Sequence, residues 1–123
     1  MIRLVNDRAL GIEVGRAALI HRIDMAESAF DSFDVKTFVD GDTPVGMLMT
    51  KHVELHVAIL PRYRRRWLSR RLIDEVLGGI IKQYGYAMTK VMADNQVGQA
   101  FVERLGFIKQ AETNGVIFYR TKP

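Results

Sequence analysis

The sequence predicts an α/β fold in which a single mixed central β-sheet carries helices on both faces. The chain has 123 residues, enough for one hydrophobic core, so residues 1–123 are expected to form one domain. Apolar residues alternate with polar ones in some segments, as in strands, and recur about every three to four residues in others, as in amphipathic helices. These segments follow in the order β-α-β-β-β-α-β-α-β-β, for which a mixed sheet between helices is the natural packing.

The N-terminal segments predict a strand followed by helical structure. Residues 2–5 form a short apolar run suited to a first strand. Between residues 7 and 30 the apolar residues recur at helical spacing. Gly11 and Gly15 lower the helix propensity of this region, so two short helices or one irregular helix are expected.

The period then changes to two, which predicts three consecutive strands. Residues 34–40 and 45–51 flank the turn-forming residues 41–44 and indicate a β-hairpin. Residues 53–60 alternate again, and this fourth strand stops at Pro61 because proline cannot donate to a sheet ladder.

A helix is predicted to connect the fourth strand to the fifth. Residues 72–81 place their apolar side chains on one helix face, and Gly85 is suited to a left-handed C-terminal cap. Residues 90–93 suggest the fifth strand. Because the connection is a crossover, the fourth and fifth strands should run parallel.

The C-terminal segments predict one more helix and a strand pair. Asn95 is a candidate N-cap for a helix over residues 96–105, which Gly106 would close. Residues 107–110 and 116–120 are expected to form the last two strands, around a polar Asn-Gly connection.

Composition narrows the function classes. The chain has no cysteine, which excludes disulfides, thiolate metal sites and thiol nucleophiles. His21 and His52 lie outside any metal-ligand spacing, so no metal is expected. Charge near the N-terminus and apolar stretches as short as residues 57–60 predict a cytoplasmic protein that does not enter membranes.

The basic residues are unevenly distributed. The formal net charge is +4, which favours anionic partners, and six arginines fall within ten residues: Arg62, Arg64, Arg65, Arg66, Arg70 and Arg71. They surround the junction between the fourth strand and the next helix, where backbone N–H groups and the positive end of a helix dipole meet solvent. Such a junction binds phosphates, and arginines add bidentate donors, so the sequence predicts a pyrophosphate site. A solvated or nucleic-acid-binding patch is the alternative.

Two segments resemble motifs of the GNAT superfamily of acyltransferases. Residues 59–69, ILPRYRRRWLS, look like motif A, in which a strand ends in an apolar residue and proline before Arg or Gln and x-x-Gly-x-Gly or Ala; Arg64 matches its first position. Residues 95–107, NQVGQAFVERLGF, are similar to motif B, where an asparagine opens a helix ending in Phe-Tyr-x-Lys-x-Gly-Phe. Together the motifs extend the resemblance over nearly the whole chain.

The resemblance implies a GNAT fold with acetyl-CoA as cosubstrate, held between the fourth and fifth strands where they splay apart. Backbone groups of Ile59 and Leu60 would pair with the pantetheine arm. Asn95 and the turn from Phe101 to Arg104 would flank the far side of the cofactor. The backbone N–H groups expected to cradle the pyrophosphate are those of Arg65, Arg66, Trp67, Leu68 and Ser69, with charge from Arg64, Arg65, Arg66 and Arg70.

The reaction implied is N-acetylation of a primary amine by direct attack on the thioester. A general base must then accept a proton from the ammonium. In the family a carboxylate on or near the fourth strand often serves as that base, which makes Glu54 the candidate and His56 the reserve. Val102 replaces the tyrosine that often protonates the leaving thiolate, so the acid would be Tyr119 or water.

Departures from the motifs keep a second function open. Trp67 and Ser69 stand where motif A has small residues, and glycine permits close approach of the backbone to a ligand. The alternative is a catalytically degenerate GNAT-fold domain with a CoA-binding, structural or nucleic-acid-binding role. For the enzyme, the expected partner is a small-molecule or peptide amine. Exposed edges of a small sheet also make a homodimer reasonable.

Overall fold

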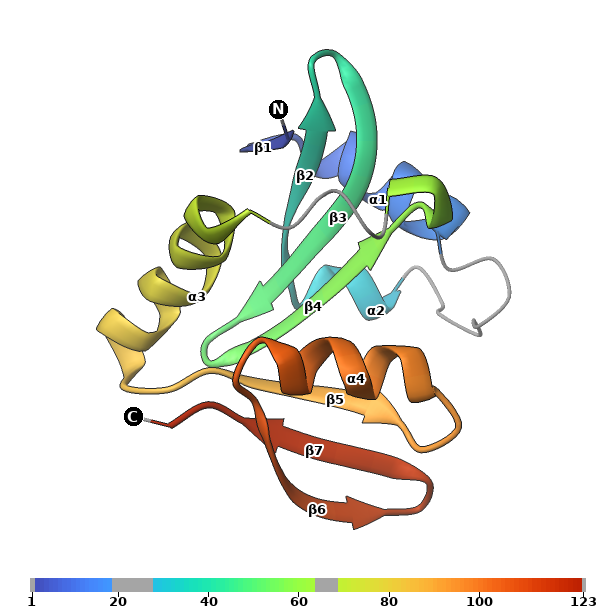
Figure 1. Cartoon of the computed structure of the whole chain (residues 1–123). Coiled ribbons are helices and arrows are strands. Elements are labelled where there is room, and N and C mark those ends of the chain that lie inside the picture. Colours follow the sequence, from blue (N-terminus) through green and yellow to red (C-terminus); the bar gives the residue numbers. More distant parts are fainter. Residues whose placement is uncertain (1, 19–27, 64–68, 123) are drawn as a thin grey trace. The chain divides into compact units, whose positions relative to one another are not determined.

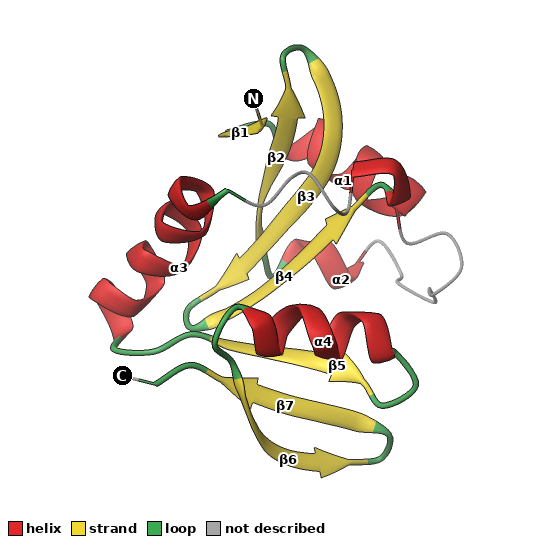
Figure 2. Cartoon of the chain, viewed as in Figure 1, coloured by secondary structure: helices red, strands yellow, loops and turns green. Residues whose placement is uncertain are grey.

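The computed structural model of the chain describes residues 2–18, 28–63 and 69–122. Its elements are β1 (Ile2–Val5), α1 (Arg8–Ala18), α2 (Ser28–Asp31), β2 (Asp34–Asp40), β3 (Thr43–Lys51), β4 (Glu54–Ile59), a 3₁₀ turn (Pro61–Tyr63), α3 (Arg70–Tyr84), β5 (Met88–Met92), α4 (Gln96–Arg104), β6 (Ile108–Thr113) and β7 (Val116–Arg120) (Figures 1 and 2). The strands formed by the described residues make one mixed sheet in the order β1-β2-β3-β4-β5-β7-β6. The predicted fold class is confirmed.

The chain divides into two compact units. The first comprises Met1–Lys51 with His56–Leu72, and the second comprises His52–Leu55 with Ile73–Pro123. Most of β4 therefore belongs to the first unit, whereas Glu54 at its start belongs to the second.

In the first unit, α1 packs on β2 and β3. Val14 and Ala18 on this helix are buried together with Val35, Met47 and Met49 on the strands. A Cβ atom at Gly15 would lie 2.5 Å from the Met47 sulfur, and one at Gly11 would lie 2.9 Å from Thr37 Oγ1. The two glycines therefore do not interrupt the helix as their propensity suggested, because they are the positions where the helix backbone approaches the sheet most closely.

The start of helix α1 is tied to α2 and to the segment that follows it. The Arg8 guanidinium donates two hydrogen bonds of 2.7 Å, one to the Phe33 carbonyl and one to the Phe30 carbonyl. The Asp7 carboxylate caps the helix by accepting from the Leu10 N–H at 3.1 Å. Two short helices or one irregular helix were expected between residues 7 and 30, and the described residues of this range form α1 and α2.

Strands β2 and β3 form the expected hairpin, but β3 begins at Thr43 rather than Val45. The reason is that the pairing continues beyond a register shift between Phe38 and Val39, to Val39↔Pro44 and Asp40↔Thr43. Both faces of this hairpin are buried. Val35 and Met49 pair on one face, and Phe38 and Leu48 lie on the other.

In the second unit, β4 and β5 run parallel, as predicted, with Glu54 level with Met88. Strand β5 pairs antiparallel with β7, and β7 pairs antiparallel with β6. Helix α4 runs along β5 (Figure 1). Helix α3 ends at Tyr84, and the φ of +92° at the following Gly85 confirms the left-handed cap.

The two faces of β5 and β7 differ in burial. Residues directly opposite in an antiparallel pair point to the same face. Thr89 with Tyr119, and Val91 with Ile117, are buried. The other face is partly or fully exposed, and carries Met88, Lys90, Met92, Val116, Phe118 and Arg120.

Strand β6 is the outermost strand beside β7, and all six of its residues are exposed. It begins at Ile108, one residue later than predicted, and continues to Thr113 because it pairs along the whole of β7. The register shifts between Lys109 and Ala111, so the intervening Gln110 forms a bulge. Its side-chain amide donates to the Ile108 carbonyl at 3.0 Å.

Candidate active site

Of the residues predicted to form the pyrophosphate cradle, the structure describes Ser69 and Arg70. Arg64, Arg65, Arg66, Trp67 and Leu68 lie outside the described residues, and their role stays a prediction. The residues on either side are described. The 3₁₀ turn at Pro61–Tyr63 follows β4 directly, and α3 begins at Arg70.

The start of α3 is capped by Ser69. Its hydroxyl accepts a hydrogen bond from the Leu72 N–H at 3.1 Å, the bond of an N-cap residue. Ser69, Arg70 and Arg71 are exposed. Since the first N–H groups of a helix have no acceptor within the helix, those of Arg70 and Arg71 are donors at the positive end of the α3 dipole. This end of the helix suits a phosphate.

At the end of β4, Ile59 and Leu60 differ in how their backbones are used. The Leu60 N–H donates to the Val45 carbonyl at 2.9 Å, and the Leu60 carbonyl accepts from the Tyr63 N–H at 2.9 Å. Backbone groups of successive strand residues point to opposite edges, so those of Ile59 point away from β3. Of the two predicted pantetheine partners, the orientation fits Ile59, because the Leu60 N–H points toward β3.

Gly46, which the sequence analysis did not single out, sets the position of this part of β4. A Cβ atom at Gly46 would lie 2.7 Å from the Ala58 carbonyl oxygen and would also collide with the Ile59 side chain. Only glycine lets β3 pass so close to β4.

Glu54, the predicted base, has a side chain that is 17% exposed and lies in an ion pair with Lys90, with 3.7 Å between its carboxylate oxygen and the lysine nitrogen. His56, the reserve, points to the same face of β4 because it is two residues away. Its ring is partly buried, and its centroid lies 5.7 Å from that of Phe33 in an edge-on contact.

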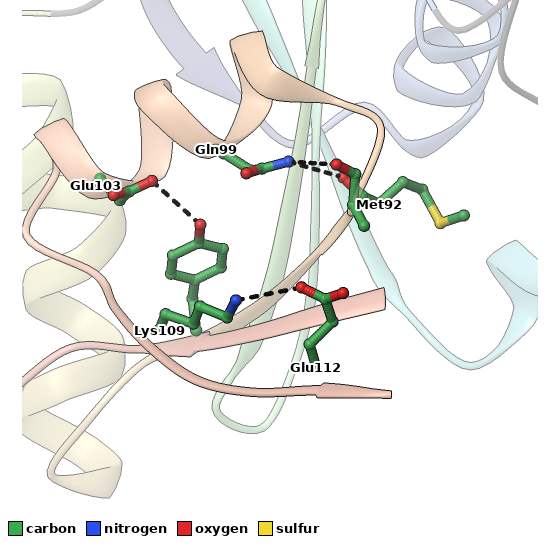
Figure 3. Close-up of polar contacts among 7 residues, drawn as sticks. Met92, Gln99, Glu103, Lys109 and Glu112 are labelled. Carbon is green, nitrogen blue, oxygen red and sulfur yellow. Dashed lines mark hydrogen bonds and ion pairs between the residues drawn. The ribbon is translucent and has the colours of Figure 1, made fainter. Parts of the chain in front are cut away.

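Tyr119, the candidate acid, is 2% exposed. Its hydroxyl donates to Glu103 on α4 at 3.1 Å, a contact drawn in Figure 3. Burial raises the pKa of Tyr119, and the hydrogen bond to Glu103 and the charge of Glu112 raise it further. Its strand partner is Thr89, whereas Glu54 is level with Met88, so Tyr119 and Glu54 point to opposite faces of the sheet.

Asn95 caps α4, as predicted, by accepting from the Gly98 N–H at 3.0 Å. On the helix itself, Phe101 is partly buried and Arg104 is exposed. Val102, at the place of the motif B tyrosine, is buried, and its hydrocarbon side chain offers no proton donor. The cofactor-side roles of Asn95, Phe101 and Arg104 stay predictions.

Two cations on the open face of the second unit were missed by the sequence analysis. The Lys90 ammonium lies 5.6 Å from the centroid of the Phe118 ring, and the Arg120 guanidinium lies 4.2 Å from that of Tyr86. The alternation of polar and apolar residues along β5 and β7 was the available signal. Across the described ranges, no group of three or more His, Asp or Glu residues is arranged to hold a metal.

Solved structures with this fold include several acetyltransferases. The ribosomal-protein-S18-alanine N-acetyltransferase of Escherichia coli aligns with a TM-score of 0.72 at 17% identity, over 98% of this chain and 93% of that one. The PaiA N-acetyltransferase of Thermoplasma acidophilum, solved with coenzyme A, gives 0.73 at 14% identity, over 100% and 99%. The spermidine N-acetyltransferase of Vibrio cholerae, a dodecamer, gives 0.71 at 14% identity, over 98% and 93%. These likenesses show the fold.

The family follows from the sequence. The model of the acetyltransferase (GNAT) family matches residues 10–107, and the chain belongs to this family. No curated protein sequence matches the chain. Among the helices of the described residues, none is long and apolar enough to cross a membrane.

Proposed function

We propose that the protein is an N-acetyltransferase that transfers an acetyl group from acetyl-CoA to a primary amine. One observation carries the proposal: in a chain of the acetyltransferase family, the capped and exposed start of α3 lies in an arginine-rich segment directly after β4. A helix start of this kind binds phosphate, and acetyl-CoA brings a pyrophosphate.

The described residues suit the two ends of such a cosubstrate. At the phosphate end, the N–H groups of Arg70 and Arg71 donate, and Arg62, Arg70 and Arg71 are exposed and supply positive charge. At the pantetheine end, the backbone of Ile59 points away from β3, and we assign the strand-like pairing to it rather than to Leu60.

Acetyl-CoA supplies the acetyl group as a thioester. The amine nitrogen attacks the thioester carbonyl carbon, a C–N bond forms, and the C–S bond breaks. Glu54 accepts the proton that the ammonium must lose. We assign the proton for the departing sulfur to water, because Tyr119 lies on the opposite face, its hydroxyl is held by Glu103, and its raised pKa makes it a poor donor.

A binding role without turnover is the second candidate. It is favoured by the buried Val102, which removes the proton donor of motif B, and by Trp67 and Ser69 in place of the motif A glycines. This candidate predicts CoA binding with no acetylation of any amine in a broad panel. Efficient acetylation of one amine excludes it.

Calorimetric titration with acetyl-CoA, CoA and ATP tests the cosubstrate. We expect acetyl-CoA and CoA to bind more tightly than ATP, because only they offer a pantetheine arm to Ile59. Arg66→Glu should weaken CoA binding about tenfold or more with little change in unfolding free energy. Arg3→Glu, the same charge change at an exposed position on β1, is the control.

Equal and weak binding of all three ligands contradicts the proposal. It would mean that the arginines attract phosphate in general, and a nucleic acid would be the next ligand to test. In that event a steep loss of affinity with salt is the signature. The homodimer stays a prediction, which light scattering during size-exclusion chromatography checks.

A further inference from the structure

Three charged side chains share the open face of the second unit. Glu54 on β4 is level with Met88 on β5, and Met88 is paired with Arg120 on β7, so Glu54 and Arg120 lie in one row across three strands. Lys90 is two residues further along β5 and therefore on the same face, one rung away. One anion and two cations thus lie within two rungs of the sheet.

Both cations are positioned by aromatic rings. Lys90 lies over Phe118, and Arg120 lies over Tyr86. A ring attracts a cation through its π face, but it accepts no conventional hydrogen bond. The ring contacts therefore leave the N–H donors of both side chains able to bind an anion, which for Lys90 is the Glu54 carboxylate in this structure.

The ion pair between Glu54 and Lys90 is suited to exchange. Its nitrogen–oxygen distance is 3.7 Å, longer than a charge-assisted hydrogen bond, and the Lys90 side chain is 41% exposed. Because the Glu54 side chain is only 17% exposed, its carboxylate must stay paired, and a ligand ammonium that takes the place of Lys90 keeps it paired. A ligand that carries an ammonium and a carboxylate can exchange with this pair. Its ammonium takes the place of Lys90 beside Glu54, and its carboxylate takes the place of Glu54 beside Lys90.

We infer that the acetyl acceptor is an amino acid, with its amine and its carboxylate on the same or on neighbouring carbon atoms. The ammonium pairs with Glu54, and the carboxylate pairs with Lys90, assisted by Arg120. The short separation of Glu54 and Lys90 requires the two ligand charges to be close neighbours. A polyamine is disfavoured, because its second cation would face Lys90 and Arg120.

This inference rests on the proposed function, since it names the acceptor for the same base. It also makes Lys90 a specificity residue, a role distinct from that of an ion pair that only fixes the β4–β5 register. The two readings separate experimentally, because a register role affects unfolding and leaves the choice between acceptors unchanged.

The test compares amino acids with their amides as acceptors. Initial rates are measured with acetyl-CoA and with L-alanine, L-glutamate, L-phenylalanine, β-alanine and the corresponding amides, together with putrescine. The KM values of the acids should be about tenfold lower than those of their amides, because an amide cannot form the charge-assisted contact to Lys90.

Lys90→Met keeps the length of the side chain and removes its charge. It should raise KM for the acids about tenfold and leave KM for the amides within about twofold, with unchanged affinity for CoA. Lys109→Met is the matched control, because Lys109 is also an exposed lysine in an ion pair, with Glu112 at 3.2 Å, on the opposite face. The control should leave all of these values unchanged.

The outcomes distinguish this inference from the proposed function. Amides or putrescine acetylated as well as the acids overturns the inference and leaves the acetyltransferase proposal intact. A preference for acids that survives in Lys90→Met also overturns it. Absence of CoA binding in the calorimetric titration overturns both.

Discussion

The two units of the molecule use their strands in different ways. In the first unit, β2 and β3 are buried on both faces, with Val35 and Met49 on one side and Phe38 and Leu48 on the other. In the second unit, β5 and β7 bury one face and leave the other partly exposed. The buried face packs with α4, and the exposed face carries Glu54, Lys90 and Arg120.

This difference in burial suggests that the strands of the first unit mainly determine folding stability and that the open face of the second unit mainly determines activity. In a strand buried on both faces, apolar side chains on either face contribute to the free energy of unfolding. Such a strand mainly stabilises the fold. In a strand with one open face, about half of the side chains contact solvent or a ligand. Substitutions in the two regions should therefore change different measurable quantities.

The largest effect is expected for Phe38→Ala. Phe38 is fully buried, and removing a buried phenylalanine ring costs about 3–5 kcal/mol of unfolding free energy. Phe118→Ala removes the same ring from the open face, where it is partly exposed, and should cost roughly 1 kcal/mol, in line with ordinary surface-near substitutions. Urea unfolding of the two variants makes the comparison, and equal losses would show that the open face is covered.

The substitution Glu54→Gln tests the catalytic role of the open face. Removal of a general base lowers kcat by about 100-fold or more, whereas the affinity for CoA should not change. Steady-state kinetics and calorimetry provide the two values. Glu112→Gln, which removes a carboxylate from an ion pair on β6, is the control and should retain full turnover. An unchanged kcat in Glu54→Gln would remove Glu54 as the base.

Two glycine substitutions compare a crowded position with an open one. Gly46→Ala places a methyl group against the Ala58 carbonyl and should cost about 1–3 kcal/mol through overpacking. It should also weaken CoA binding if Ile59 pairs with the pantetheine. Gly78 lies inside α3 with nothing near its Cβ position, so Gly78→Ala should stabilise by about 0.5–1 kcal/mol. Thermal unfolding and calorimetry check both variants.

The smallest effect concerns Tyr119 on the buried face. Because the pKa of Tyr119 is raised in the folded protein, the unfolded chain loses the phenol proton first as pH rises. The resulting stability is present below about pH 10 and is lost as the pH rises through the folded pKa. Tyr119→Phe should lose about 1 kcal/mol with the hydrogen bond to Glu103 and show a shallower decline above pH 10. Urea unfolding between pH 8 and pH 11 measures it, and an unchanged slope contradicts the assignment.

The order of elements was predictable because each depends on local periodicity and on caps such as Asn95 and Gly85. Boundaries failed where pairing overrides local signals. Thr43 and Pro44 belong to β3 because Asp40 and Val39 on β2 pair with them beyond a register shift, and β6 runs to Thr113 because β7 offers partners that far. Neither shift is visible in one strand read alone.

The parts of the candidate site that are formed by consecutive residues could be predicted from the sequence. The parts that depend on contacts between residues distant in sequence could not. The strand, arginine and helix succession from Ile59 to Arg70 could be read directly. The cap by Ser69 could also have been read, because serine before a helix is a known start signal. The burial of Tyr119, the engagement of Leu60 with Val45 and the pairing of Lys90 with Glu54 arise from contacts distant in sequence, which periodicity does not encode.

The outer edge of β6 bears on how the protein behaves at high concentration. An exposed edge strand is a template on which further strands can add, and repeated addition leads to aggregation. Here the Gln110 bulge bends the ladder, its side chain covers the Ile108 carbonyl, and Lys109 with Glu112 places charge along the strand. These features discourage templated growth, so this edge should protect the protein from forming fibrils.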